Sequence, residues 1–150
     1  MSKTRVIVAR SGVRLTRGVA GLEPFVPTAE RPWDAKLAGH LLRRAMFGPQ
    51  PGEIAAAAGM TPEKAVDQLL AVLSPPDPPG PWVSEAPFRN PTPEQQQTYR
   101  DRMNELRFWW ANLMLTQGVS LRERMVLFWH NHFATEAKAV QIPQLMYNQH

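Results

Sequence analysis

Hydrophobic residues recur at helical spacing over most of the chain from residue 33 onward. The first such stretch covers residues 33–46 and ends at Gly48, a typical stop signal for a helix. A shorter stretch covers residues 52–58, and a third begins after Thr61 with a proline in the favoured first helical position. We therefore predict three helices within residues 32–73.

A longer amphipathic stretch, residues 94–117, follows the start signal Thr92-Pro93-Glu94-Gln95 and ends at Gly118. Its apolar positions share one helical face: Tyr99, Met103, Leu106, Trp110, Leu113 and Met114. Another helix is predicted to begin only three residues after Gly118. Because so short a connection joins neighbouring antiparallel helices, we predict a helix hairpin in residues 94–150.

The second helix of this hairpin lies in the segment SLRERMVLFWHNHFATE, residues 120–136. Ser120 and Glu123 have the spacing of a capping box, which predicts a helix start at Leu121. Apolar and aromatic residues then follow helical spacing along one stripe: Leu121, Met125, Phe128, Trp129, His132 and Phe133. We predict that this stripe packs against a core, with about 1.5–3 kcal/mol from each buried large side chain.

Two other segments lack this periodicity. Residues 1–31 show no sustained helical pattern, and residues 74–93 are rich in proline. We interpret the first as a basic, disordered N-terminal arm and the second as a linker between the two helical parts. The predicted fold class is all-α, an irregular helical bundle with a proline-rich linker and a C-terminal antiparallel hairpin.

The net charge of +4 is confined to the N-terminal arm. Five of the seventeen basic residues precede Glu23, the first acidic residue, which leaves twelve basic against thirteen acidic residues in the rest of the chain. Residues 52–73 have the look of a helix-turn-helix, but Glu63 and Asp67 on its second helix would repel phosphates. We therefore do not expect a nucleic-acid partner, although DNA binding by this segment remains an alternative hypothesis.

Cysteine is absent, which excludes disulfides, thiolate zinc sites and a cysteine nucleophile. The apolar run at Val6–Ala9 is too short for a secretory signal, and no apolar segment has the length of a membrane span. With no export signal visible, a cytoplasmic location is expected. The sequence also contains no phosphate-binding glycine loop, no nucleophile elbow and no HExxH pair, and no cofactor is indicated.

The histidines of the segment invite a metal-site hypothesis. His130 and His132 cannot hold one ion on a helix, because residues two apart point about 200° away from each other. His132 and Glu136 are four residues apart, hence on one helical face, and could supply part of a histidine and carboxylate site. The alternative is that His132 is a hydrogen-bonded core residue and His130 lies at a polar or interface position.

Two separated motifs, HLLRRAMFGP at residues 40–49 and LRERMVLFWHNHFATE at residues 121–136, together resemble the N-terminal part of one family. This is the bacterial "domain of unknown function 1800" family of large, mainly helical proteins. The resemblance implies a fold class but no reaction. It also implies that relatives continue well past the position of His150, and many of them begin with an export signal. We therefore expect the chain to be an N-terminal piece.

Several polar residues fall on positions that match the family pattern, namely Arg44, Arg122, Arg124, His130, Asn131 and His132. Arg44 and His40 are placed beside the apolar stripe of the first helix, so we expect Arg44 to form an ion pair or to bind a ligand. Arg122 and Arg124 lie at a helix start, where positive charge is unfavourable. This indicates an acidic partner segment or an anionic ligand.

The leading functional hypothesis is an N-terminal helical module that acts as a scaffold or interaction surface without a self-contained catalytic site. Its expected partner is the missing C-terminal portion of the same protein or another protein chain. The alternatives are part of a metal-dependent hydrolase-like site that uses His132 and Glu136, and DNA binding by residues 52–73.

Overall fold

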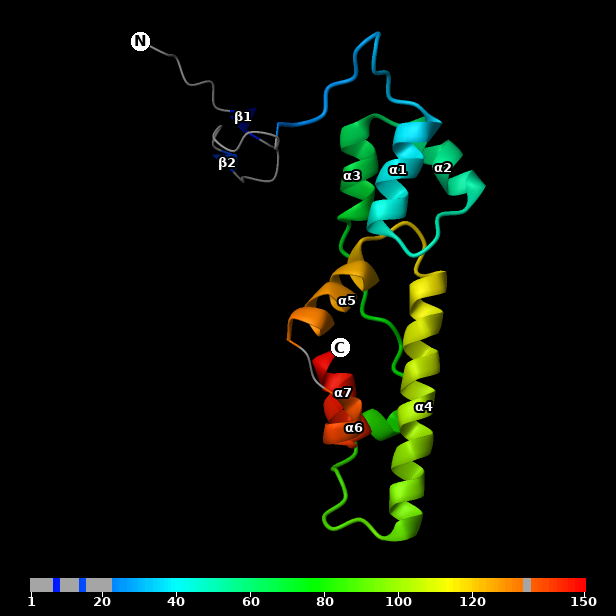
Figure 1. Ribbon diagram of the computed structural model, residues 1–150, viewed down its shortest axis with the longest axis vertical. Helices are drawn as coiled ribbons and strands as arrows, with labels where there is room; N and C mark the ends of the chain where they lie inside the picture. The colour runs from blue at the N-terminus through cyan, green and yellow to red at the C-terminus, as the bar shows by residue number, and fades with distance from the viewer. Residues whose placement is uncertain (1–6, 9–13, 16–22, 134–135) are drawn as a thin grey trace. The chain divides into compact units, whose positions relative to one another are not determined.

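The computed structural model describes residues 7–8, 14–15, 23–133 and 136–150, in two units that divide after Pro32. In the first unit, strand β1 (Ile7–Val8) pairs antiparallel with β2 (Arg14–Leu15). The regular elements of the second unit are helices (Figure 1), so the all-α fold class is confirmed. Most of the predicted N-terminal arm lies outside the described residues, and its disorder stays a prediction.

Three helices build the first core: α1 (Ala35–Ala45), α2 (Pro51–Ala58) and α3 (Pro62–Leu69). The Asp34 carboxylate accepts a hydrogen bond from the Leu37 amide at 2.9 Å, and the Thr61 hydroxyl accepts one from the Lys64 amide at 3.3 Å. Both are the N-cap contacts that satisfy free amides at a helix start. The helices enclose a cluster of small and medium apolar residues: Ala38, Leu42, Ala45, Met46, Ala57, Ala65 and Leu69.

The inward face of α1 differs from the predicted one. Leu42 is fully buried, whereas His40 and Arg44, predicted to lie beside the apolar stripe on the inward face, are exposed. The two faces are displaced by about one residue, or about 100° of helix rotation. The correction follows from packing against α2 and α3, which contact the side of α1 that carries its small residues and Leu42.

The long helix α4 (Pro93–Thr116) begins with the predicted capping box, in which the side chains and amides of Thr92 and Gln95 exchange hydrogen bonds. Gly118 follows the helix with a φ of +72°, a left-handed conformation that glycine adopts at little cost. The chain then turns back into α5 (Arg122–His132), as Figure 1 shows. It continues into α6 (Ala137–Val140) and α7 (Pro143–Gln149), and α7 packs along α4.

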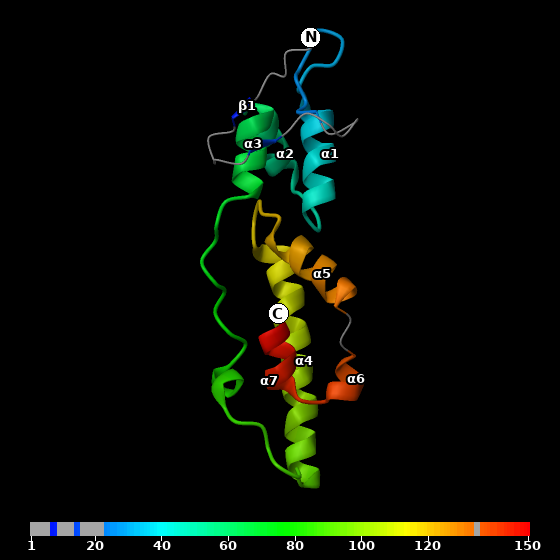
Figure 2. The same ribbon diagram turned by 90° about the vertical axis from the view of Figure 1, so that its left-hand side faces the viewer.

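The proline-rich stretch does more than connect helices, because it contributes to a second core. Within it, the 3₁₀ helix η1 (Pro81–Ser84) lies beside α4 in Figure 1, and the turned view of Figure 2 shows it on the side of α7. The Trp82 indole is buried and donates a hydrogen bond to Glu105 Oε2 at 2.8 Å. Trp82 clusters with Met103 and Leu106 of α4, and side chains from α6 and α7 cover them.

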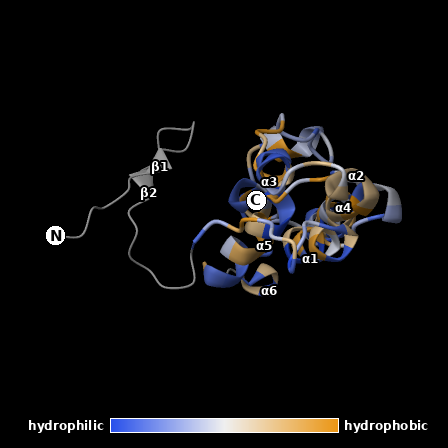
Figure 3. Ribbon diagram, turned by 90° about the horizontal axis from the view of Figure 1, so that it is seen from above, coloured by the Kyte–Doolittle hydropathy of each residue, from blue (hydrophilic) through white to orange (hydrophobic). Residues whose placement is uncertain are grey.

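Hydrophilic and hydrophobic residues alternate along the helices of the second unit, as Figure 3 shows, so these helices are amphipathic rather than apolar all round. None of the described helices combines the length and the apolar character that crossing a bilayer demands.

Candidate functional site

A buried carboxylate, Glu123, lies at the start of α5, and its side chain is 0% exposed. Its Oε2 accepts a hydrogen bond from the Trp110 indole at 3.0 Å, and its Oε1 accepts one from Arg122 Nε at 3.0 Å. His150 Nε2 lies 3.6 Å from Oε2. Burying a carboxylate is costly unless it is paired and hydrogen-bonded, and these contacts provide that compensation.

The predicted capping box of α5 is wrong. The Ser120 hydroxyl accepts from the Arg122 amide at 3.1 Å, while the Glu123 amide donates to Gln117 Oε1 at 3.2 Å. The Glu123 carboxylate therefore turns into the protein instead of reaching back to the Ser120 amide. The competing partners decide the outcome, because Trp110 and Arg122 offer the carboxylate two donors where the capping box offers one.

Two histidines complete this cluster, which we call the Glu123 cluster and which comprises Trp110, Arg122, Glu123, His130 and His150. The centroid of the His130 ring lies 4.7 Å from that of the Trp110 ring and 6.1 Å from that of the His150 ring. The pKa of His130 is lowered by burial, and nearby Glu123 opposes this shift. Burial also lowers the pKa of His150, against the attraction of Glu123 and with the help of His130 and Arg122.

These lowered pKa values predict a loss of stability in mild acid. The unfolded chain takes up protons on both histidines near the ordinary pKa of 6.5, before the folded chain does. Their stabilising contribution is therefore complete above about pH 6.5 and declines as the pH falls toward the lowered values. Thermal melts between about pH 7.5 and 5.5 should show a falling Tm.

The double variant His130→Asn/His150→Gln should flatten this pH dependence, because the titrating rings are gone. Substitution of the exposed His132 by glutamine is the matched control. An unchanged pH dependence in the double variant would contradict the assignment.

The predicted pair His132 and Glu136 does not share a helix. The α5 helix ends at His132, and Glu136 is the residue before α6, so the four-residue helical spacing that suggested a common face is absent. Among residues 7–8, 14–15, 23–133 and 136–150, no three histidine, aspartate or glutamate side chains form a group able to hold a metal ion. Metal ligation by His132, Glu136 or His130 stays a prediction, but the shared helical face that suggested it for His132 and Glu136 is absent.

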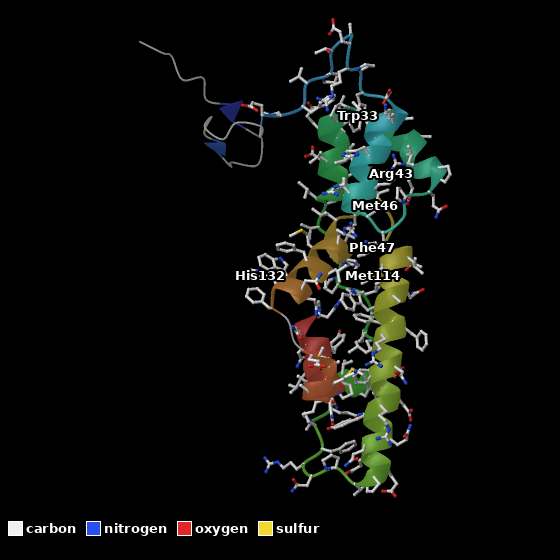
Figure 4. All side chains as sticks on the ribbon, in the orientation of Figure 1. Trp33, Arg43, Met46, Phe47, Met114 and His132 are labelled. Carbon is white, nitrogen blue, oxygen red and sulfur yellow. The ribbon has the colours of Figure 1, made fainter. Side chains whose placement is uncertain are left out.

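Most of the predicted stripe of α5 faces away from the core, which overturns the prediction that it is buried, although Leu121 at its start packs against the first core. Phe128 is 53% exposed, Trp129 48% and Phe133 63%, and Met125 is exposed beside them. His132 lies among these rings, stacked on Phe128 at 6.2 Å, and Figure 4 shows it on the side of α5 away from α4. We call Met125, Phe128, Trp129 and Phe133 the aromatic face.

Helical geometry explains this reversal. Residues on an α-helix turn by about 100° each, so His130 lies within about 20° of Glu123, and both point inward. Met125, Phe128 and Trp129 then lie about 140° to 240° around the axis from Glu123. Anchoring the carboxylate and His130 in the interior therefore turns the aromatic face outward.

Three of the polar residues singled out from the sequence meet at one groove. Arg44 from the end of α1 and Arg124 and Asn131 from α5 line a hollow of about 490 Å³, together with Leu121, Met125, Leu127 and Phe128. The Arg124 guanidinium lies 5.2 Å from the centre of the Phe47 ring, in a cation–π contact. Figure 4 places Phe47 between α1 and α5. The predicted ion pair of Arg44 does not occur within the described residues.

The other residues predicted to form sites lie outside this groove. His40 is exposed on α1, and Arg122 belongs to the Glu123 cluster, where its Nη1 also donates to the Ser74 carbonyl at 2.9 Å. The helix-turn-helix segment consists of α2 and α3 packed on α1, with Glu63 and Asp67 exposed. DNA binding by this segment remains untested.

Sequence reasoning missed the central role of Glu123, because it assigned the carboxylate to a local cap. The roles of Trp110 and His150 were missed as well. Charge alternation in Arg122-Glu123-Arg124 was the available signal, since a carboxylate between two arginines at a helix start suits a paired, inward position.

Comparison with known proteins identifies a family model, described as "Protein of unknown function (DUF1800)", that matches residues 40–150. No curated protein and no solved structure matches the chain. The family match covers both the groove and the Glu123 cluster.

Proposed function

Because this chain belongs to the DUF1800 family of proteins of unknown function, we propose its role from its structure: a helical scaffold module that binds another polypeptide segment through α5. The observation that carries this proposal is the exposure of three neighbouring aromatic rings, Phe128 and Trp129 on α5 and Phe133 at its C-cap. Large contiguous apolar patches are rare on the surfaces of soluble monomers and mark interaction sites.

The aromatic face is ordered by contacts among its own rings. The Phe128 and Trp129 centroids are 5.1 Å apart, and Trp129 stacks on Phe133 at 5.6 Å with the ring planes inclined by 12°. Rings held in this way lose little conformational freedom when a partner covers them. Tryptophan and other large aromatic residues also dominate binding energy at protein interfaces.

The Glu123 cluster supports the same proposal, since it holds the inner side of α5 by polar contacts and leaves the aromatic side outward. Burying a carboxylate while large rings stay in water is a poor arrangement for stability alone. It is a suitable arrangement for presenting a rigid apolar surface to a partner.

The proposal can be tested by selecting ligands from a displayed library of random 16-residue peptides on the full 150-residue chain. We expect enriched peptides to lose about 30-fold or more in affinity for the Phe128→Ala/Trp129→Ala variant, because truncating central aromatic residues of an interface costs about 2 kcal/mol or more. Binding is measured by calorimetry with individual synthetic peptides.

The matched control is Phe108→Ala, which removes an exposed ring from the outer side of α4. It should leave peptide affinity unchanged. The aromatic double variant should melt near the wild-type temperature, because its rings are largely exposed. Peptides that bind the double variant as tightly as the wild type would refute the proposal.

A further inference from the structure

The groove beside the aromatic face has a charge pattern that specifies its partner more closely. Met125 and Phe128 belong to both surfaces, so a segment lying on the aromatic face extends naturally into the groove. The groove has an apolar floor of leucine, methionine and phenylalanine side chains. Its polar lining consists of Arg44, Arg124 and Asn131.

No carboxylate in the described part of the chain pairs with the arginines that line this groove. Neither Arg44 nor Arg124 forms an ion pair with a described carboxylate, and no acidic side chain is among the described residues that line the groove. Asn131, an exposed residue, adds an amide to the lining of the same groove. A planar guanidinium matches a carboxylate particularly well, since it donates two parallel hydrogen bonds.

We infer that the groove binds an acidic amphipathic peptide segment, in which an aspartate or glutamate carboxylate meets Arg44 and Arg124 while neighbouring apolar side chains cover Met125 and Phe128. This inference rests on the proposed function and names the chemistry of the partner. The apolar floor favours a peptide over a nucleic acid, whose phosphate backbone requires an extended basic surface.

The Arg124 guanidinium contacts the ring of Phe47, a residue that follows α1, and this cation–π contact restrains the arginine side chain. Arg44 comes from α1 and Arg124 from α5, so two helices contribute arginines to the lining of one groove. Recognition of an acidic motif by clustered arginines is an established mode of peptide binding.

The test uses the peptides selected on the wild-type chain. We expect enrichment of sequences that contain an acidic residue next to large apolar residues. Changing that acidic residue to its amide should weaken binding about threefold to tenfold, and Arg44→Gln and Arg124→Gln should each have a similar effect. Binding should also weaken in high salt, because part of the groove is open to solvent.

Arg43→Gln is the matched control, since Arg43 is the exposed neighbour of Arg44 and does not line the groove. It should leave affinity unchanged. In Figure 4 Arg43 is labelled on α1, above Met46 and Phe47.

Several outcomes would overturn the inference. The inference is wrong if the selected peptides bind equally well in acidic and amide forms and if Arg44→Gln and Arg124→Gln leave their affinities unchanged. The proposed function still stands in that case if binding of these peptides depends on Phe128 and Trp129. Loss of that aromatic dependence would refute both. A concentration-dependent dimer abolished by Phe128→Ala/Trp129→Ala would identify a second copy as the occupant. Arginine-dependent binding to phosphatidylglycerol vesicles, with no peptide selected, would identify a membrane surface.

Discussion

Replacing Glu123 with alanine is expected to lower the free energy of unfolding by about 3 kcal/mol, because removing one member of a buried ion pair leaves its partners uncompensated. The substitution takes the acceptor from the Trp110 indole and from Arg122 Nε, and it opens a cavity where a fully buried side chain stood. Chemical denaturation monitored by circular dichroism measures the effect. Glu123→Gln should cost less, since its amide oxygen still accepts a hydrogen bond.

The matched control for Glu123 is Glu85→Ala. Glu85 also pairs with an arginine, Arg102, at 2.7 Å, but half of its side chain is exposed. Its loss should cost less than about 1 kcal/mol, the usual range for a surface ion pair. Equal losses for Glu123→Ala and Glu85→Ala would show that the Glu123 cluster does not anchor α5.

Replacing Leu42 with alanine should lower the free energy of unfolding by about 2–5 kcal/mol, the range for deleting a buried leucine side chain. Leu42 is 0% exposed at the centre of the first core, where α1 packs on α2 and α3. These short helices hold their places by packing, since isolated helices of such length are marginal in water. Denaturant unfolding again measures the loss.

Leu70→Ala is the control for Leu42→Ala, because the same side chain is removed from a position that is 61% exposed. A change below about 1 kcal/mol is expected there. If both substitutions destabilise the protein equally, the first core is not organised around Leu42.

Much of the helical architecture could be predicted from the sequence. The capping box at Thr92 and the stop at Gly118 are confirmed, and Tyr99, Met103 and Leu106 are buried on the predicted inner face of α4. These features depend on residues within one or two turns of each other, so a local pattern is sufficient to identify them.

The candidate site was predicted less well. Arg44, Arg124 and Asn131 were singled out as polar positions, but their meeting at one groove was not foreseen, because α1 and α5 are separated by more than seventy residues of sequence. The inward face of α1 was also predicted wrongly. Small and large apolar residues both occur along this helix, so two adjacent faces fitted the helical spacing of apolar residues.

The sequence by itself determined that the second unit is helical, where most of its helices begin and end, and that α5 carries an aromatic stripe. Only the tertiary structure decided which side of α5 turns inward. A helix can bury either of its two sides, and hydrophobicity alone favours the aromatic one. The Trp110 indole from α4 and Arg122 Nε donate the hydrogen bonds that hold the Glu123 carboxylate inside, so the aromatic side is left to face solvent.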